Sequence, residues 1–216
     1  EKTGKAVELA CDLETKSLNP YAPKAWIIAA SFTIDDGKSD VLYFTKDEAP
    51  KAPLPWVPQE EMNYWEALWT QVNWILTTSK VSLRGANFKF DANWIYLKWG
   101  IACTNQRFDT MLVGSLLDEN RSNSLKLHAK IMTPMGGYED DMDKYDFSCL
   151  EKVPKPELLN YVGGDTDATY RVAIRMRNDL LADQKMSNFY VKLLHPSSKV
   201  FEKMERNGVC LDIPYY

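Results

Sequence analysis

The sequence predicts an α/β fold in which a mixed five-stranded sheet is flanked by helices. Three strand-like segments come first, at 6–14, 25–34 and 40–45, and the polar stretch 35–39 predicts a turn between the last two. Helical and strand-like segments then alternate along the rest of the chain. Three leading strands followed by this alternation are typical of a mixed sheet with helices packed on it.

The segments after the three strands can be assigned in order. A Pro-rich stretch at 49–58 predicts an extended surface loop. Residues 60–76 predict a helix, and we interpret its apolar face as a core stripe rather than a ligand-binding group of aromatic side chains. That face carries Met62, Trp65, Leu68, Trp69, Val72, Ile75 and Leu76. Residues 80–100 predict a fourth strand and a helix, 103–109 a fifth strand, and 108–120 the start of another helix.

Composition limits the classes of function. The 216 residues, 45% of them hydrophobic, can bury the core of one domain. A net charge of −4 argues against a broad surface that coats duplex DNA, but it leaves room for a small site that binds a strand end. No segment is long and apolar enough to span a bilayer, and we find no zinc cluster and no GxxxxGK or GxGxxG loop. Four scattered cysteines without a CxxC pair predict a reduced, cytoplasmic protein.

Three acidic residues occupy positions that indicate a shared site. Asp12 and Glu14 are two residues apart in the first strand, so their side chains leave the same face. Asp91 comes just past the end of the fourth strand, four residues after Asn87 and near a helix start. The alternative for Asp91 is an ordinary helix-capping acid.

A fourth acid, Asp165, lies at the edge of an apolar stripe in a late helix. The stripe consists of Leu158, Val162, Thr169, Ala173, Met176 and Leu180. An ionised carboxylate that faces a core is costly unless it is paired or binds a cation, and Tyr161 lies one turn before it. The alternative is again a cap, because Gly163 and Gly164 are poor helix formers and predict a break or bend there.

Taken in order, these patterns resemble the 3′–5′ exonuclease domain of family A DNA polymerases, which belongs to the tyrosine branch of the DEDD nucleases. The matching motifs are DLET (12–15), NFKFD (87–91) and YVGGD (161–165), supported by FDTMLVGSLL (108–117). Asn160 stands where the histidine branch carries its histidine, and the glycine pair departs from the family's pattern. The resemblance implies a ribonuclease H-like exonuclease domain over 1–187. It also implies that 188–216 begin the connection into a polymerase domain of the same parent chain, because 200–212 resemble that entry.

Clustered carboxylates also need a counter-charge. Two unit charges 4 Å apart repel by about 4 kcal/mol at an effective dielectric of 20. Mg²⁺ or Mn²⁺ ions prefer oxygen ligands, and a pair of them suits an in-line phosphoryl displacement. The resemblance implies two such ions, bridged by Asp12. Glu14 and Asp165 would complete one ion's ligands, Asp91 would reach the other through water, and Tyr161 would orient the attacking water.

The resemblance also implies contacts with DNA. Leu18 occupies the position of an apolar wedge between the last two bases, Asn87 is assigned to the same strand end, and Tyr138 matches an aromatic that stacks on a base. The alternatives are core packing for Leu18 and an ordinary exposed loop aromatic for Tyr138. Three basic residues are candidates for contacts with phosphates, and the alternative for each is a solvated surface charge. They are Lys16, Arg84 and Lys89.

The implied activity is removal of nucleoside 5′-monophosphates from single-stranded or frayed DNA 3′ ends, in the cytoplasm of a bacterium or phage-infected cell or in an organelle. Two alternatives remain open. One is a ribonuclease D-like exoribonuclease, which the polymerase-like residues 205–212 argue against. The other is a catalytically silent scaffold, which the presence of all four acids and Tyr161 argues against.

Overall fold

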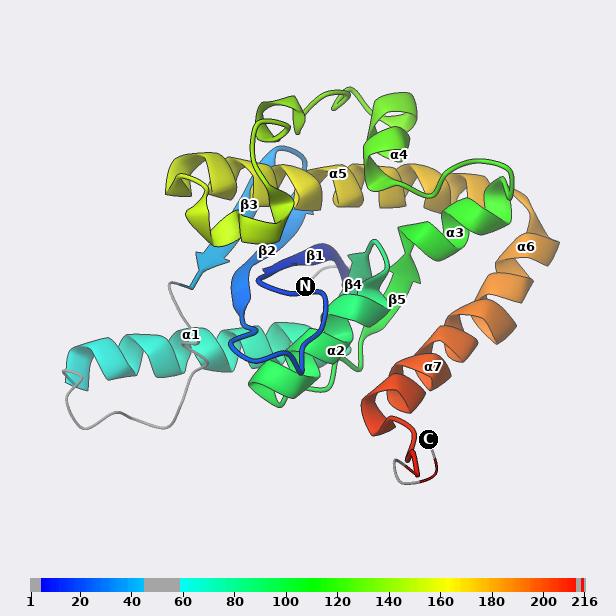
Figure 1. Cartoon of the computed structure of the whole chain (residues 1–216). Helices are drawn as coiled ribbons and strands as arrows, with labels where there is room; N and C mark the ends of the chain where they lie inside the picture. Colours follow the sequence, from blue (N-terminus) through cyan, green and yellow to red (C-terminus); the bar gives the residue numbers. More distant parts are fainter. Residues whose placement is uncertain (1–4, 45–58, 213–214, 216) are drawn as a thin grey trace.

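The computed structural model describes residues 5–44, 59–212 and 215 (Figure 1). Its sheet contains the five predicted strands. They are β1 Val7–Thr15, β2 Ile27–Asp35, β3 Lys38–Tyr43, β4 Val81–Gly85 and β5 Gln106–Asp109. The Pro-rich loop predicted at 49–58 lies outside the described residues.

The sheet is mixed, as predicted. Its strand order is β3-β2-β1-β4-β5, with β1/β2 and β2/β3 antiparallel and β1/β4 and β4/β5 parallel. The predicted turn between β2 and β3 is present, and Gly37 adopts a positive φ of 75° there, a conformation that glycine reaches without steric cost. This order makes β1 the central strand, so side chains on β1 are flanked by a strand on each side.

Helices cover both faces of the sheet (Figure 1). α5 contacts β1 to β4 on one face, whereas α1 and α2 contact β4 and β1 on the other face. The helices are α1 Gln59–Thr77, α2 Phe88–Trp99, α3 Thr110–Leu117, α4 Leu125–Met132, α5 Lys155–Ala182, α6 Gln184–Phe189 and α7 His195–Asn207. Short 3₁₀ turns, η1 Asp140–Met142 and η2 Phe147–Lys152, precede α5, and a π-helical turn, η3 Tyr190–Leu194, joins α6 to α7.

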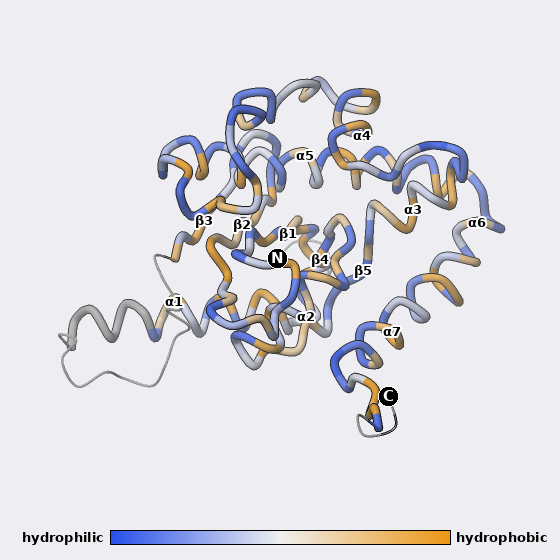
Figure 2. The backbone as a smooth tube through the Cα atoms, in the orientation of Figure 1, coloured by the Kyte–Doolittle hydropathy of each residue, from blue (hydrophilic) through white to orange (hydrophobic). Residues whose placement is uncertain are grey.

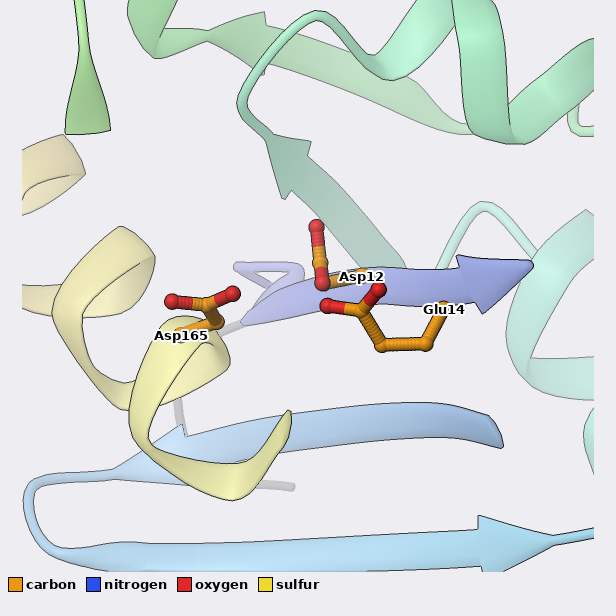
Figure 3. A group of neighbouring side chains, drawn as sticks. All are labelled: Asp12, Glu14 and Asp165. Carbon is orange, nitrogen blue, oxygen red and sulfur yellow. The ribbon is translucent and has the colours of Figure 1, made fainter. Parts of the chain in front are cut away.

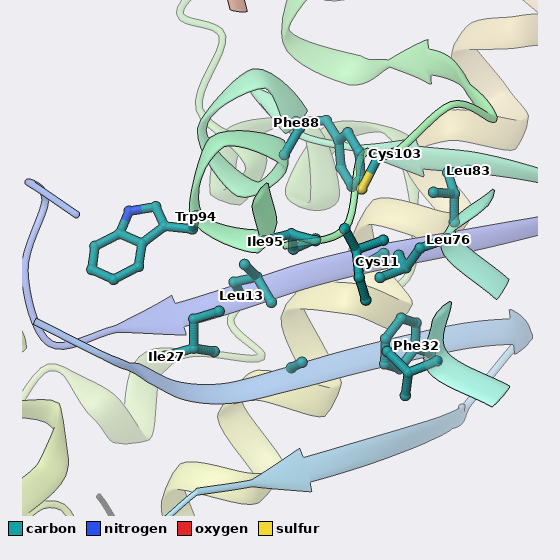
Figure 4. Packing of buried hydrophobic residues seen from close by; sticks show 14 of the residues in the cluster. Cys11, Leu13, Ile27, Phe32, Leu76, Leu83, Phe88, Trp94, Ile95 and Cys103 are labelled. Atoms are coloured by element: carbon teal, nitrogen blue, oxygen red, sulfur yellow. The ribbon is translucent and has the colours of Figure 1, made fainter. Parts of the chain in front are cut away.

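The largest core lies between the sheet and α1 and α2 (Figure 4). Cys11 and Leu13 of β1 pack there with Phe88 and Trp94 of α2. Val72 and Leu76 of the predicted α1 stripe are buried in the same core, and Trp69 and Ile75 pack against it, which confirms the core interpretation for these four residues. Side chains alternate along a strand, so Asp12, between these two residues, and Glu14, which follows them, face α5 instead.

α5 is one continuous helix from Lys155 to Ala182, so the alternative of a break at the glycine pair, with Asp165 capping a new helix, is wrong. Gly163 faces β3, and a Cβ added there would lie 3.4 Å from the Ser39 Cβ, an ordinary van der Waals distance. Ser39 Oγ donates to the Gly163 carbonyl oxygen over 2.8 Å, and Ser31 Oγ donates to the Val162 carbonyl oxygen over 3.1 Å. The packing and these hydrogen bonds outweigh the low helix propensity of glycine.

The C-terminal helices run along the side of the domain, with hydrophilic and hydrophobic residues interspersed along them (Figure 2). α7 contacts α2, where Asn93 Nδ2 donates to Glu205 Oε2 over 3.1 Å. Residues 200–207, which are expected to lead into a polymerase domain, belong to α7 and are helical. The predicted domain boundary between residues 187 and 188 stays a prediction. The four cysteines are free thiols. None of the helices in the described ranges is long and apolar enough to cross a membrane.

Candidate active site

Three of the predicted acids converge at the centre of the sheet (Figure 3). Asp12 and Glu14 leave the face of β1 that α5 covers, and Asp165 approaches from α5. One carboxylate oxygen from each residue lies within 4.8 Å of the other two. This arrangement of oxygen donors, partly shielded from water, fits a hard divalent cation.

Burial and mutual repulsion both act on these carboxyl groups. Burial raises the pKa of Asp12 well above its usual range, and the charge of Asp165 raises it further. Burial, then Asp12 and Asp165, raises the pKa of Glu14 in the same way. Burial raises the pKa of Asp165 to about 6. Negative charge in the metal-free site is therefore unfavourable, as expected of clustered carboxylates.

Asp91 lies beside this group but is not one of the three. It is 3% exposed and belongs to the first turn of α2, where burial and then the charge of Asp12 raise its pKa. The N-cap position of α2 belongs to Asn87, so the capping interpretation of Asp91 is wrong. A buried carboxylate next to Asp12 could serve a second cation through water, and that role stays a prediction.

Tyr161 lies one helical turn before Asp165, and its hydroxyl is close enough to the carboxyl groups of Asp165 and Glu14 to favour their charged forms. Burial, followed by the charges of Asp165 and Glu14, raises the pKa of Tyr161 far above its usual value. The hydroxyl therefore keeps its proton near neutral pH and acts as a donor. Phe147 packs edge to face on its ring at a centroid distance of 5.7 Å, a contact that no sequence motif indicated.

Asp109, at the end of β5, is a buried residue that no sequence motif assigned to a site. Its carboxylate accepts the N–H groups of Asn87 and Phe88 over 3.0 and 2.9 Å. It also accepts those of Met111 and Leu112 over 3.0 and 3.3 Å. Asp109 therefore ties the start of α2, which carries Asp91, to the start of α3. The signal available was an Asp directly before a helical segment, typical of an N-cap.

Two of the three predicted DNA contacts line one cavity of about 350 Å³. Leu18 is 88% exposed, so the core-packing alternative for it is wrong. Asn87 adopts a left-handed conformation with φ 57° and ψ 40° at the start of α2. Phe90 and Arg206 also line the cavity, which places it between the β1–β2 connection, α2 and α7.

Tyr138, the third predicted DNA contact, lies instead beside the cluster formed by Asp12, Glu14 and Asp165. Its hydroxyl donates to Asp165 Oδ1, and its ring is half-buried, so the alternative of an ordinary exposed loop aromatic is wrong. Base stacking by Tyr138 stays a prediction.

The three candidate cations differ in surroundings. Arg84 is 2% exposed and pairs with Glu8, so it is neither a solvated charge nor free to reach a phosphate. Lys16 pairs with Glu151 over 2.6 Å, and Lys89 pairs with Glu205 beside the cavity.

A sequence model of the 3′–5′ exonuclease found in family A DNA polymerases matches residues 1–181. The chain belongs to this family. DNA polymerase I of Borreliella burgdorferi is 29% identical over 217 residues, which cover 100% of this chain and 22% of that protein. The DNA polymerase of Escherichia phage T5 is 29% identical over 145 residues, which cover 59% of this chain and 17% of that protein. This member of the exonuclease family therefore spans about a fifth of the length of these relatives.

Solved structures confirm the fold class. Brucella melitensis NrnC with bound Mg²⁺ superposes with a TM-score of 0.62 at 15% identity, covering 98% of this chain and 93% of NrnC. The POL domain of Pol1 from M. smegmatis, in complex with DNA primer-template and dNTP, gives 0.62 at 13% identity, covering 96% of this chain and 30% of that one. At these identities the likeness shows the ribonuclease H-like fold alone.

Proposed function

We propose that this chain is a metal-dependent 3′–5′ exonuclease that shortens single-stranded or frayed DNA ends as the proofreading part of a bacterial or phage DNA polymerase. The observation that carries the proposal is the group formed by Asp12, Glu14 and Asp165, with their oxygens within 4.8 Å, beside Tyr161. Membership in the exonuclease family and the polymerase relatives support it. The polymerase domain of the same parent chain would be its partner.

The residues present fit two divalent cations, Mg²⁺ or Mn²⁺. Asp12, Glu14 and Asp165 offer converging oxygen donors for one, and Asp91 lies beside Asp12 for the other. Bound cations would lower the pKa of the attacking water and stabilise the charge that develops on the phosphate. They would also favour the ionised carboxylates that the metal-free site disfavours.

The protein's own groups would place the reactants. Tyr161, which keeps its proton, would donate a hydrogen bond that orients the water, and Glu14 would accept one from it. Leu18 and Asn87, which line the cavity, would contact the strand end. Water forms a bond to the terminal phosphorus while the bond from phosphorus to the preceding O3′ breaks. The products are a nucleoside 5′-monophosphate and a strand one nucleotide shorter with a free 3′-OH.

A 5′-labelled single-stranded DNA is expected to shorten stepwise from its 3′ end in Mg²⁺ or Mn²⁺ and to stay intact in EDTA. A duplex with a matched end should react more slowly, because unpairing the terminal bases costs a few kcal/mol. Gel electrophoresis of labelled DNA and RNA strands measures both, and an Asp165→Asn preparation controls for contaminating nuclease. Equal rates on matched and frayed ends would contradict proofreading, and faster cleavage of RNA would favour the exoribonuclease alternative.

The Tyr161→Phe variant is expected to lose about 10–100-fold in rate, the order of magnitude for one positioning hydrogen bond. Its metal affinity should be nearly unchanged, because its hydroxyl is assigned to the attacking water, whereas the hydroxyl that donates to Asp165 Oδ1 is that of Tyr138. Single-turnover cleavage and Mn²⁺ titration measure the two effects. Tyr145→Phe is the matched control, since Tyr145 donates to Glu157 over 2.9 Å rather than to the three carboxylates. A wild-type rate in Tyr161→Phe would show that the tyrosine is a packing residue.

A further inference from the structure

A second tyrosine, which does not belong to α5, contacts the cluster of three acidic residues through Asp165. Tyr138 lies between α4 and η1, and its hydroxyl donates to Asp165 Oδ1. Burial, followed by the charge of Asp165, raises the pKa of Tyr138 above its usual value, so its hydroxyl keeps its proton. The predicted stacking role requires only the ring, and this hydrogen bond requires the hydroxyl.

The ring of Tyr138 lies against Gly164, where a side chain would crowd it. A Cβ on Gly164 would lie 3.0 Å from Tyr138 Cδ2, closer than nearly all real contacts of that kind. Gly163 faces the other way, toward Ser39 and Val41 of β3. The two glycines of the YVGGD motif therefore have different neighbours: a Cβ on Gly163 would make ordinary contacts with β3, whereas a Cβ on Gly164 would press on the tyrosine ring.

The segment that carries Tyr138 is itself held in place. The Tyr138 N–H donates to the Met135 carbonyl oxygen over 3.3 Å, and Glu139 pairs with Lys126 of α4 over 3.2 Å. The ring also packs against the hydrophobic cluster formed with α3 and α5. The hydroxyl thus approaches Asp165 from a segment anchored at both the backbone and the neighbouring side chain.

Asp165 has two carboxylate oxygens, and in Figure 3 one of them points toward Asp12 and Glu14 while the other points away. We propose that Tyr138 is a positioning residue whose hydroxyl fixes the orientation of the Asp165 carboxylate for cation binding, and that Gly164 is what admits its ring. This inference rests on the proposed function, because it assumes that Asp165 holds a cation. Outer-shell partners of this kind change metal affinity or activity by about 10–100-fold.

The test is direct titration of the metal-free protein with Mn²⁺, followed by calorimetry, without nucleic acid. Tyr138→Phe keeps the ring and removes the hydroxyl, so we expect its Kd for Mn²⁺ to rise by about 10-fold. With single-stranded DNA, kcat at limiting Mn²⁺ should fall while KM stays near the wild-type value. A role in stacking alone predicts wild-type affinity and rate for Tyr138→Phe and a higher KM for Tyr138→Ala.

The glycines provide a matched pair of variants. Gly164→Ala should weaken Mn²⁺ binding by displacing the Tyr138 ring, and this loss should shrink in the Tyr138→Phe background. Gly163→Ala makes the same substitution one residue away, against β3, and should leave Mn²⁺ affinity near the wild-type value. Circular dichroism confirms that each variant is folded.

Two outcomes separate the inference from the proposed function. If the wild type binds Mn²⁺ and Tyr138→Phe binds it equally or more tightly, the positioning role is overturned while the proposed function stands. If the wild type binds no Mn²⁺, or binds it no better than Asp12→Asn does, the proposed metal site fails, and the inference fails with it.

Discussion

Replacing Asp12 with Asn is expected to raise the melting temperature of the metal-free protein and to remove most of its nuclease activity. Asp12 lies on the central strand and belongs to the cluster of three acids, where burial and then the charge of Asp165 raise its pKa. The amide keeps the shape of the side chain and removes one charge. We expect a gain of about 1–2 kcal/mol in EDTA near neutral pH, after solvent screening of the repulsion.

Millimolar Mg²⁺ should reduce or reverse this difference in melting temperature, because a cation that binds only the folded state stabilises the wild type by mass action. Activity should fall by more than about 100-fold, since loss of an outer-shell partner alone costs 10–100-fold. Asp35→Asn is the matched control, because Asp35 is an exposed aspartate at the end of β2 that pairs with Lys38 over 3.1 Å. The Asp35→Asn substitution should not raise the melting temperature in EDTA. A lower melting temperature for Asp12→Asn in EDTA would contradict a shared metal site.

The advantage of Asp12→Asn in EDTA should depend on pH. Burial raises the pKa of Asp165 to about 6, whereas an unfolded chain titrates it near 3.9. Within this window the folded state holds a proton that the unfolded state has released, so the metal-free fold loses stability as the pH rises from about 4 to 6. As the pH falls through about 6, the folded state protonates Asp165, which relieves the repulsion on Asp12, so the difference in melting temperature should shrink.

The parts of the site that follow from local periodicity could be predicted from the sequence. Asp12 and Glu14 share a face because a strand repeats every two residues, and Cys11 and Leu13 enter the core for the same reason. The apolar stripe of α5 likewise placed Asp165 at the edge of the core. These relations need only the backbone geometry of one element.

The features that depend on contacts between distant segments could not be predicted. Helix propensity indicated a break at the glycine pair, but close packing against Ser39 and Tyr138 keeps α5 continuous. Arg84 belongs to a strand whose neighbour supplies Glu8, and that pairing depends on the strand order. Propensity scales describe one segment at a time, so they carry no information about such neighbours.

The Asp109→Asn variant tests whether Asp109 orients Asp91, the buried acid beside Asp12, Glu14 and Asp165. Asp109 Oδ1 accepts the N–H groups of Asn87, Met111 and Leu112, and Oδ2 accepts that of Phe88. These bonds hold Asn87 in its left-handed conformation, and α2 begins directly after it. The direction in which Asp91 enters the site therefore depends on Asp109.

In Asp109→Asn one carboxylate oxygen becomes an NH₂ group. Three of the four N–H groups can keep their acceptor, but the NH₂ then faces the N–H of Phe88, and rotating the amide would leave three N–H groups without an acceptor. We expect a loss of about 1–3 kcal/mol in stability for the unpaired buried donor. Well below the melting temperature, the rate of DNA cleavage should fall by about 10–100-fold because Asp91 is displaced. Urea unfolding and single-turnover cleavage measure the two losses separately.

Asp183→Asn is the matched control, because Asp183 caps α6 by accepting two N–H groups, those of Lys185 and Met186, through one oxygen, Oδ1. Asn caps a helix nearly as well as Asp, and Asp183 is exposed, so both its stability and its cleavage rate should stay near the wild-type values. Full activity in folded Asp109→Asn would show that Asp109 supports the fold without orienting the site. A wild-type midpoint of urea unfolding would show that the four hydrogen bonds tolerate the amide. A fall in rate beyond that of the control, in protein that remains folded, is the result expected if the loop between β4 and α2 positions Asp91.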